Sequence, residues 1–182
     1  MRRATLLAGA ILMAGASAHA ETWRVEPART EIAFEVGAKG YPVTHGVFRN
    51  FASTLSIDFD RPQRSMVNFT VTAASLDTQI PVLDAYVTSP AFLNATQFPD
   101  IRFVSTAVRK LDEQSVEVTG NLTLLGVTHP ETFTVQVARD AASAVTLHAE
   151  GQVRRSAYGM TAGLPLISDD VRIIVATRAE AH

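Results

Sequence analysis

Apolar side chains recur at every second position in run after run of this chain between residues 22 and 181. In one run, Ile32, Phe34 and Val36 alternate with smaller or charged neighbours. Alternation with a period of two is typical of β-strands that bury one face, because successive side chains point to opposite sides of a strand. Further runs of this kind cover Phe51–Phe59, Val67–Val71, Ile101–Phe103, Val116–Leu124, Phe133–Val137, Val145–Val153 and Val171–Val175.

The links between these runs are short, and several consist of turn residues such as Asp60–Gln63 and Asp112–Gln114. Parallel strands need crossover connections of about a dozen residues or more, so links of this length favour antiparallel pairing. The pattern therefore predicts an all-β protein with a single antiparallel sheet of about eight or nine strands. A sheet of about that size closes into a barrel that can hold core side chains or one small ligand.

The stretch around residues 82–98 breaks the alternation. Val82, Leu83, Tyr86 and Val87 recur there at helical spacing, and a Ser-Pro pair follows them. Apolar residues three and four positions apart share one face of a helix. We expect a short helical insert in this stretch, packed across one end of the barrel.

Residues 1–20 have the features of a secretory signal peptide, namely two arginines, a short apolar run and the cleavage motif Ala18-His19-Ala20. We expect cleavage after Ala20, which leaves one β-barrel domain over residues 21–182 in the periplasm. The chain has no cysteine, and a domain of this size can be stable without disulfides. The formal net charge of −2 and the lack of a basic run argue against a nucleic-acid partner.

The residues predicted to point inward favour a hollow barrel. The chain has nine Phe and one Trp, so its aromatic rings mostly need no hydrogen-bond partner. Small residues also occupy positions that are predicted to point inward, and they leave room where a filled core would hold larger side chains. A filled interior, with the small residues placed by strand crossing, stays open as the alternative. The small residues are Ser53, Ala73, Gly120, Ala149 and Gly151.

Sequence blocks along nearly the whole of residues 21–182 resemble those of the YceI family in order and spacing. The most specific block is Gly-Asn-Leu-Thr-Leu-Leu-Gly-Val-Thr-His-Pro at residues 120–130. The other matching blocks begin at Trp23, Ile32, Gly46, Ser75, Ser89, Phe98, Arg155 and Asp170.

The resemblance implies a periplasmic, lipocalin-like antiparallel barrel that binds an isoprenoid chain or a similar long amphiphile. Polyprenyl phosphates, isoprenoid quinones and fatty-acid derivatives are the ligand types associated with the family. This sequence departs from the family pattern at Asn121, Leu125, Ala157 and the Arg29-Thr30 pair, so no head-group role is carried over to those positions. Each buried methylene contributes about 0.8 kcal/mol, so a plain apolar tunnel can hold a long tail without catalytic residues.

The candidate lining residues are aromatic or apolar side chains at positions that are predicted to point into the barrel. Any of them could instead be ordinary core, and those of the helical insert could form a lid or plug the barrel end. They are Phe34, Phe51, Phe69, Phe103, Leu122, Phe133 and Tyr158, together with Tyr86, Phe92 and Phe98 in the helical insert.

Arg49 and Arg155 share parity with apolar neighbours and are candidate contacts for a polar head group, because charge-assisted hydrogen bonds from arginine are strong. His45, His129 and His148 lie far apart without metal-ligand spacing, so we expect no metal site. The sequence contains no nucleophile elbow and no Gly-rich phosphate loop. We therefore expect no catalytic residues, no cofactor and no enzymatic activity.

The leading hypothesis is a periplasmic protein that binds, transports or sequesters a long isoprenoid-type lipid or a fatty-acid-like amphiphile. One alternative is an accessory protein that presents a quinone to a membrane cytochrome. Others are a hydrolase or isomerase acting on a bound lipid, and a protein with a filled core that acts through its surface. An exposed strand edge of such a barrel would also allow a homodimer.

Overall fold

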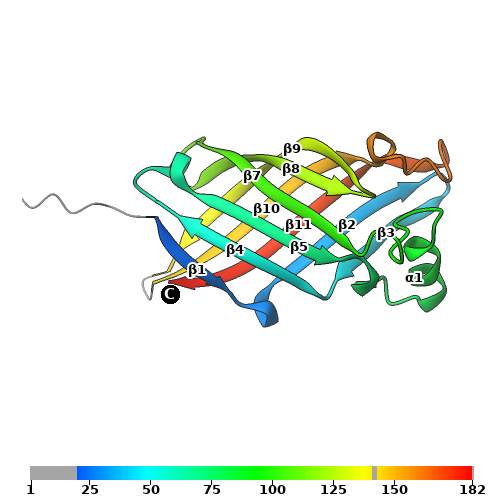
Figure 1. Ribbon diagram of the computed structural model, residues 1–182, viewed down its shortest axis with the longest axis horizontal. Helices are drawn as coiled ribbons and strands as arrows, with labels where there is room; N and C mark the ends of the chain where they lie inside the picture. Colours follow the sequence, from blue (N-terminus) through cyan, green and yellow to red (C-terminus); the bar gives the residue numbers. More distant parts are fainter. Residues whose placement is uncertain (1–19, 141–142, 182) are drawn as a thin grey trace, which may run out of the picture.

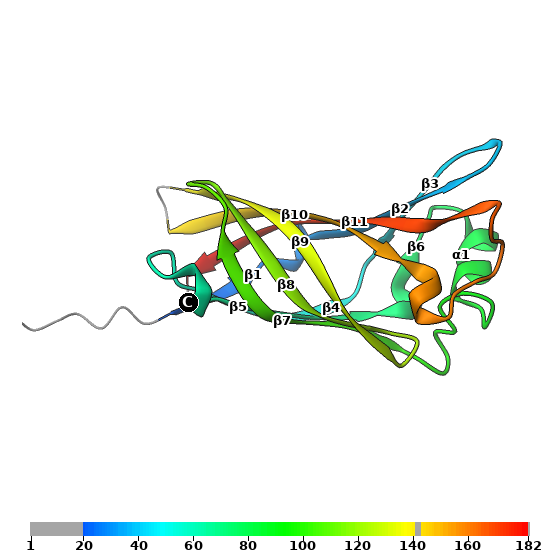
Figure 2. The same cartoon turned by 90° about the horizontal axis from the view of Figure 1, so that it is seen from above.

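The computed structural model describes residues 20–140 and 143–181, and these form an antiparallel sheet with a short helix at one end (Figures 1 and 2). The predicted signal peptide lies outside the described residues, apart from Ala20. The strands are β1 Glu21–Val25, β2 Glu31–Ala38, β3 Tyr41–Phe48, β4 Phe51–Ile57, β5 Met66–Thr72, β6 Leu76–Asp77, β7 Asp100–Lys110, β8 Ser115–Leu124, β9 Val127–Arg139, β10 Ala144–Arg154 and β11 Ile167–Ala181.

Eight strands close into a ring in the order β1-β4-β5-β7-β8-β9-β10-β11, and β11 pairs back with β1. The long strand β11 takes two neighbours on one edge, because it pairs with β1 through Ala179–Ala181 and with β2 through Ile167–Ala176. The 3-10 helix η1 (Pro27–Arg29) separates β1 from β2, and its proline has no N–H to donate to a sheet. The predicted antiparallel barrel is confirmed, and β2, β3 and β6 extend it at one end.

Tight hairpins connect several neighbouring strands. Leu125 and Gly126 join β8 to β9 with φ values of 53° and 75°, the geometry of a two-residue hairpin turn that matches the twist of the flanking strands. Lys39 and Gly40 join β2 to β3 in a similarly short loop. Such links explain why strands that follow one another in the chain are neighbours in the barrel.

Helix α1 (Pro81–Thr88) lies at the end of the barrel opposite the C-terminus (Figures 1 and 2). Pro81 occupies the first turn, where a missing N–H costs nothing. Oδ1 of Asp84 accepts hydrogen bonds from the backbone N–H and the hydroxyl of Thr78, which ties the helix to the chain after β6. The predicted helical insert is thus one helix followed by turns, and it packs across one barrel end as expected.

The buried apolar side chains form three separate clusters rather than one continuous core. One cluster surrounds Phe34 and Phe92 near α1, a second surrounds Trp23 and Val145 towards the other end, and a third centres on Val118. Residues of all three clusters contribute to the wall of one interior cavity. The barrel is hollow rather than filled, in agreement with the first of the two interpretations of the inward residues.

Candidate functional site

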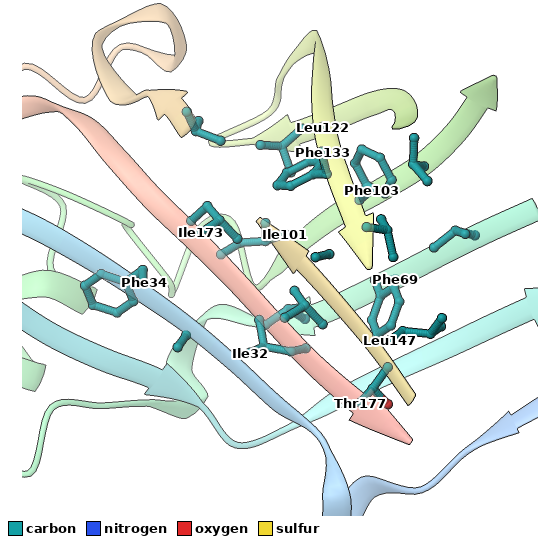
Figure 3. A pocket seen from close by; sticks show the side chains of 18 of the residues that line it. Ile32, Phe34, Phe69, Ile101, Phe103, Leu122, Phe133, Leu147, Ile173 and Thr177 are labelled. Atoms are coloured by element: carbon teal, nitrogen blue, oxygen red, sulfur yellow. The ribbon is translucent and has the colours of Figure 1, made fainter. Parts of the chain in front are cut away.

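A cavity of about 510 Å³ runs inside the barrel (Figure 3). Its wall takes side chains from β2, β4 and β5 and from every strand between β7 and β11, so the cavity follows the barrel axis. The wall is hydrocarbon along most of its length, because the alternating strands turn their apolar faces inward. The side chains labelled in Figure 3 are Ile32, Phe34, Phe69, Ile101, Phe103, Leu122, Phe133, Leu147, Ile173 and Thr177.

Three of the phenylalanine rings in this wall lie against glycines. A Cβ atom on Gly151 would be 2.6 Å from Cδ1 of Phe133, which is closer than van der Waals contact allows. The inward-facing glycines thus give space to neighbouring rings, whereas Ala149 lines the cavity itself. The three pairs are Phe34 with Gly46, Phe103 with Gly120 and Phe133 with Gly151.

The substitution Gly46→Ala is expected to lower the free energy of unfolding by about 1–3 kcal/mol, the usual cost of overpacking a core. The added Cβ would overlap the ring of Phe34 and would lie 3.1 Å from Cγ2 of Thr78. Adding Phe34→Leu removes that ring, so the double variant should be more stable than the two separate losses predict. Urea unfolding of all four proteins checks this, and strictly additive losses would contradict it.

Most of the predicted lining residues lie on the cavity wall. Phe103 and Phe133 meet edge to face with their ring centroids 5.2 Å apart. Tyr86 and Phe92 make a similar contact at 4.9 Å where α1 covers the barrel end. These contacts hold the rings in place and shape the wall. The predicted residues found on the wall are Phe34, Phe69, Phe103, Leu122, Phe133, Tyr86 and Phe92.

Three predicted lining residues are placed elsewhere. Phe51 packs against the cluster around Trp23 and Val145, and its ring centroid is 5.9 Å from that of Phe69. Phe98 lies against the β8–β9 turn, where a Cβ on Gly126 would be 3.0 Å from its Cε1 atom. Tyr158 is buried in the cluster near α1. Strand parity identifies the buried face of a segment, but it does not show whether a side chain reaches the cavity or packs beyond it.

Arg155 lies at the α1 end of the cavity and is only 2% exposed. Its guanidinium donates hydrogen bonds of 2.7 to 3.1 Å to four backbone carbonyls between Met160 and Ser168. Burial lowers the pKa of Arg155. The carbonyl contacts hold the segment that joins η4 (Arg155–Tyr158) to β11 in place. The inward placement of Arg155 was predicted, but this structural role was not.

Further hydrogen bonds fasten η4 across the same end of the barrel. The hydroxyl of Tyr158 donates to Oε1 of Glu131 at 2.8 Å, and its ring meets that of His129 at 5.2 Å. Burial and then the hydrogen bond to Glu131 raise the pKa of Tyr158, so the phenol stays protonated as a donor. The hydroxyl and N–H of Ser156 donate to Asp169, and the hydroxyl bond is the main cause that lowers the pKa of that carboxyl.

The opposite end of the cavity reaches charged side chains in the hairpin turns. Nζ of Lys110 is 2.9 Å from Oε1 of Glu113. The guanidinium carbon of Arg139 lies 3.8 Å from the ring centroid of Phe59, and no carboxylate pairs with Arg139 in the part of the chain that the structure describes. The sequence predicts the turn at Asp112–Gln114. It does not show that this turn and Arg139 border the same cavity, because only closure of the ring brings them together.

Arg49 is exposed in the link between β3 and β4 and is not part of the cavity wall. Its Nη2 atom is 2.7 Å from Oδ2 of Asp77. That hydrogen bond is the main cause that holds the pKa of Asp77 below its ordinary value. Of the two arginines predicted to meet a head group, only Arg155 reaches the cavity.

Within residues 20–140 and 143–181, no three His, Asp or Glu side chains lie close enough together to hold a metal ion. The same residues contain no helix with the length and hydropathy needed to cross a membrane. What the cavity offers chemically is an apolar surface with polar groups towards its ends.

A family model described as the YceI-like domain matches residues 23–179. A UPF0312 protein of Enterobacter sp. (strain 638) is 30% identical over 174 residues, covering 92% of this chain and 90% of the relative. Protein YceI of Salmonella arizonae is 31% identical over 147 residues, covering 78% and 76%. The resemblance of the sequence blocks is confirmed by these matches.

Solved structures show the same architecture. BcnA of Burkholderia cenocepacia superposes with a TM-score of 0.80 at 24% identity, covering 85% of this chain and 99% of that one. A polyisoprenoid binding domain from Saccharophagus degradans, implicated in plant cell wall breakdown, gives a TM-score of 0.70 at 15% identity, covering 90% and 100%. At these identities the likeness establishes the fold.

Proposed function

Because the chain belongs to the YceI-like domain family, we propose that it binds a long isoprenoid-type lipid or a fatty-acid-like amphiphile inside the barrel. It carries or sequesters this lipid in the periplasm without chemical turnover. The observation that carries the proposal is the apolar cavity of about 510 Å³ between α1 and the hairpin turns at the opposite end. The solved polyisoprenoid binding domain with the same fold supports the ligand class.

The cavity wall suits a hydrocarbon tail. Small-molecule sites usually have volumes of about 300–1,000 Å³, and the cavity of about 510 Å³ falls within that range. Each methylene moved out of water contributes about 0.8 kcal/mol, so affinity should grow with tail length. An isoprenoid or acyl chain has no hydrogen-bonding groups, so it leaves nothing unsatisfied against a wall of Phe, Leu, Ile and Val.

We place the polar head group at the end that carries Lys110 and Arg139. A guanidinium without a carboxylate partner can donate to a phosphate, carboxylate or quinone oxygen. The N–H groups of Arg155 are engaged by backbone carbonyls, and Arg49 pairs with Asp77. Arg139 is therefore a better candidate for the head-group contact than either arginine predicted from the sequence.

The test is native mass spectrometry of the protein purified from its own periplasm, followed by organic extraction. We expect a defined adduct with the mass of an isoprenoid lipid or a fatty-acid derivative. A recovered quinone would favour presentation to a membrane cytochrome, whereas a prenyl phosphate would favour transport or storage. A ligand-free mass from folded protein, together with no binding of added polyprenyl phosphate, quinone or fatty acid, would overturn the proposal.

A further inference from the structure

Helix α1, the β2–β3 hairpin and the loop before β11 lie at one end of the barrel (Figures 1 and 2). Each of these three segments exposes large apolar side chains. Tyr41 on the β2–β3 hairpin is 77% exposed, Val82 on α1 is 78% exposed, and Leu166 before β11 is 64% exposed. Isolated apolar residues are ordinary on a surface, but a group of them at one end indicates an interaction site. We define the apolar rim as Tyr41, Val43, Ile80, Val82, Tyr86, Leu164 and Leu166.

The three segments that form the apolar rim carry almost no charge. Residues 37–44, 80–89 and 159–166 contain one cation, Lys39, and one carboxylate, Asp84. Hydrogen bonds from Thr78 engage the carboxylate of Asp84, which leaves Lys39 as the exposed charge. Specific protein interfaces carry about one hydrogen bond per 100–200 Å², and this rim has few side chains that could supply them. A lipid bilayer does not require matched hydrogen-bond partners, and its anionic head groups attract an exposed cation such as Lys39.

The apolar rim is continuous with the cavity wall. The same three segments supply wall residues, including Ala38 and Thr44 from the hairpin, Tyr86 from α1 and Met160 from the loop before β11. The backbone N–H of Lys39 donates to the carbonyl of Leu166 at 2.8 Å, which holds the hairpin and that loop together. A lipid tail could therefore pass between the cavity and an apolar phase outside without crossing water.

We propose that the apolar rim docks on a lipid bilayer and that the lipid enters the cavity at this end with its head group leading, so that the head group reaches Lys110 and Arg139 and the tail follows. Val82 and Leu166 would enter the interfacial region, and the amphipathic rings of Tyr41 and Tyr86 would lie at the level of the lipid head groups. Lys39 would contact anionic head groups. This inference rests on the proposed lipid-binding function, because it assigns the route by which the same cavity is loaded.

The experiment compares a rim variant with a matched control. The rim variant combines Val43→Asp, Val82→Asp and Leu166→Asp, and the control combines Met66→Asp and Val104→Asp, two exposed apolar residues away from the rim. Vesicles of phosphatidylethanolamine and phosphatidylglycerol serve as the probe in flotation and in transfer of a fluorescent prenyl lipid between vesicles. We expect the rim substitutions to lower both the fraction of protein bound to vesicles and the rate of lipid transfer about tenfold. The control should match the wild type in both assays.

Binding of the prenyl lipid added from detergent should be equal in all three proteins, because the cavity wall is unchanged. Serine at the same three rim positions should lower flotation and transfer in the same direction, and it introduces no charge. Equal flotation and transfer by rim variant and control would overturn the inference, as would a wild-type dimer that the rim substitutions dissociate while flotation is unchanged. Failure of every protein to bind the detergent-delivered lipid would instead overturn the proposed function.

Discussion

The substitution Ala149→Phe is expected to remove nearly all lipid binding while the barrel stays folded. Ala149 lines the cavity, and its cross-strand neighbours Val135 and Val175 line it as well, so an added ring would stand within the tunnel. A ring that displaces about five methylene groups of the tail costs about 4 kcal/mol, or about a thousandfold in affinity. Titration with a fluorescent prenyl or fatty-acid probe measures the loss.

The matched control for this variant is Thr146→Phe, which adds a large ring on the outward face of the same strand, β10. Its affinity should equal that of the wild type. Urea unfolding of Ala149→Phe should give a free energy of unfolding near the wild-type value or above it, because the ring fills apolar space that is empty without ligand. Unchanged affinity in folded Ala149→Phe would show that the tail does not lie in the middle of the barrel.

The substitution Arg155→Ala is expected to lower the free energy of unfolding by about 3–5 kcal/mol. The guanidinium donates to four backbone carbonyls at the α1 end, and its loss leaves those acceptors without their donor in a buried region. Arg155→Lys should lie between the wild type and Arg155→Ala, since an ammonium has fewer donors and no planar fork. Urea unfolding followed by circular dichroism gives these values.

The neighbouring Arg154 provides the control, because its side chain is exposed and its removal should change the free energy of unfolding by about 0.5 kcal/mol or less. A loss below about 1 kcal/mol in Arg155→Ala would mean that water satisfies the carbonyls as well as the guanidinium does. In that case Arg155 would be available to a head group, as its inward parity first indicated.

Much of the fold could be predicted from the sequence because its signals are local. The alternation around Phe34 and around Phe133 identified strands and their buried faces, since parity depends only on a residue and its near neighbours. The helical spacing from Val82 to Val87 identified α1 for the same reason. The division of the first strands into β1 and β2 was not predicted, because it depends on how β11 shares one edge between two partners.

The candidate site was predicted less completely. Phe51 and Phe69 have the same inward character, yet only Phe69 is part of the wall. Arg139 was not predicted, because nothing near it in the sequence shows that its turn opens on the same cavity as Lys110. These differences arise from how side chains of different strands pack once the ring has closed, which cannot be read from any one strand.

The sequence by itself determined the antiparallel β-class, the face that each strand buries, the helical insert and the family, because each follows from local periodicity or from ordered sequence blocks. The tertiary structure alone decided which inward side chains border empty space, how Gly46 makes room for Phe34, and that Arg155 holds a loop. It also decided that the exposed apolar side chains gather at the α1 end. Closure of the ring brings residues that are far apart in the chain to the same position along the barrel axis. The alternation within a single strand carries no information about that position.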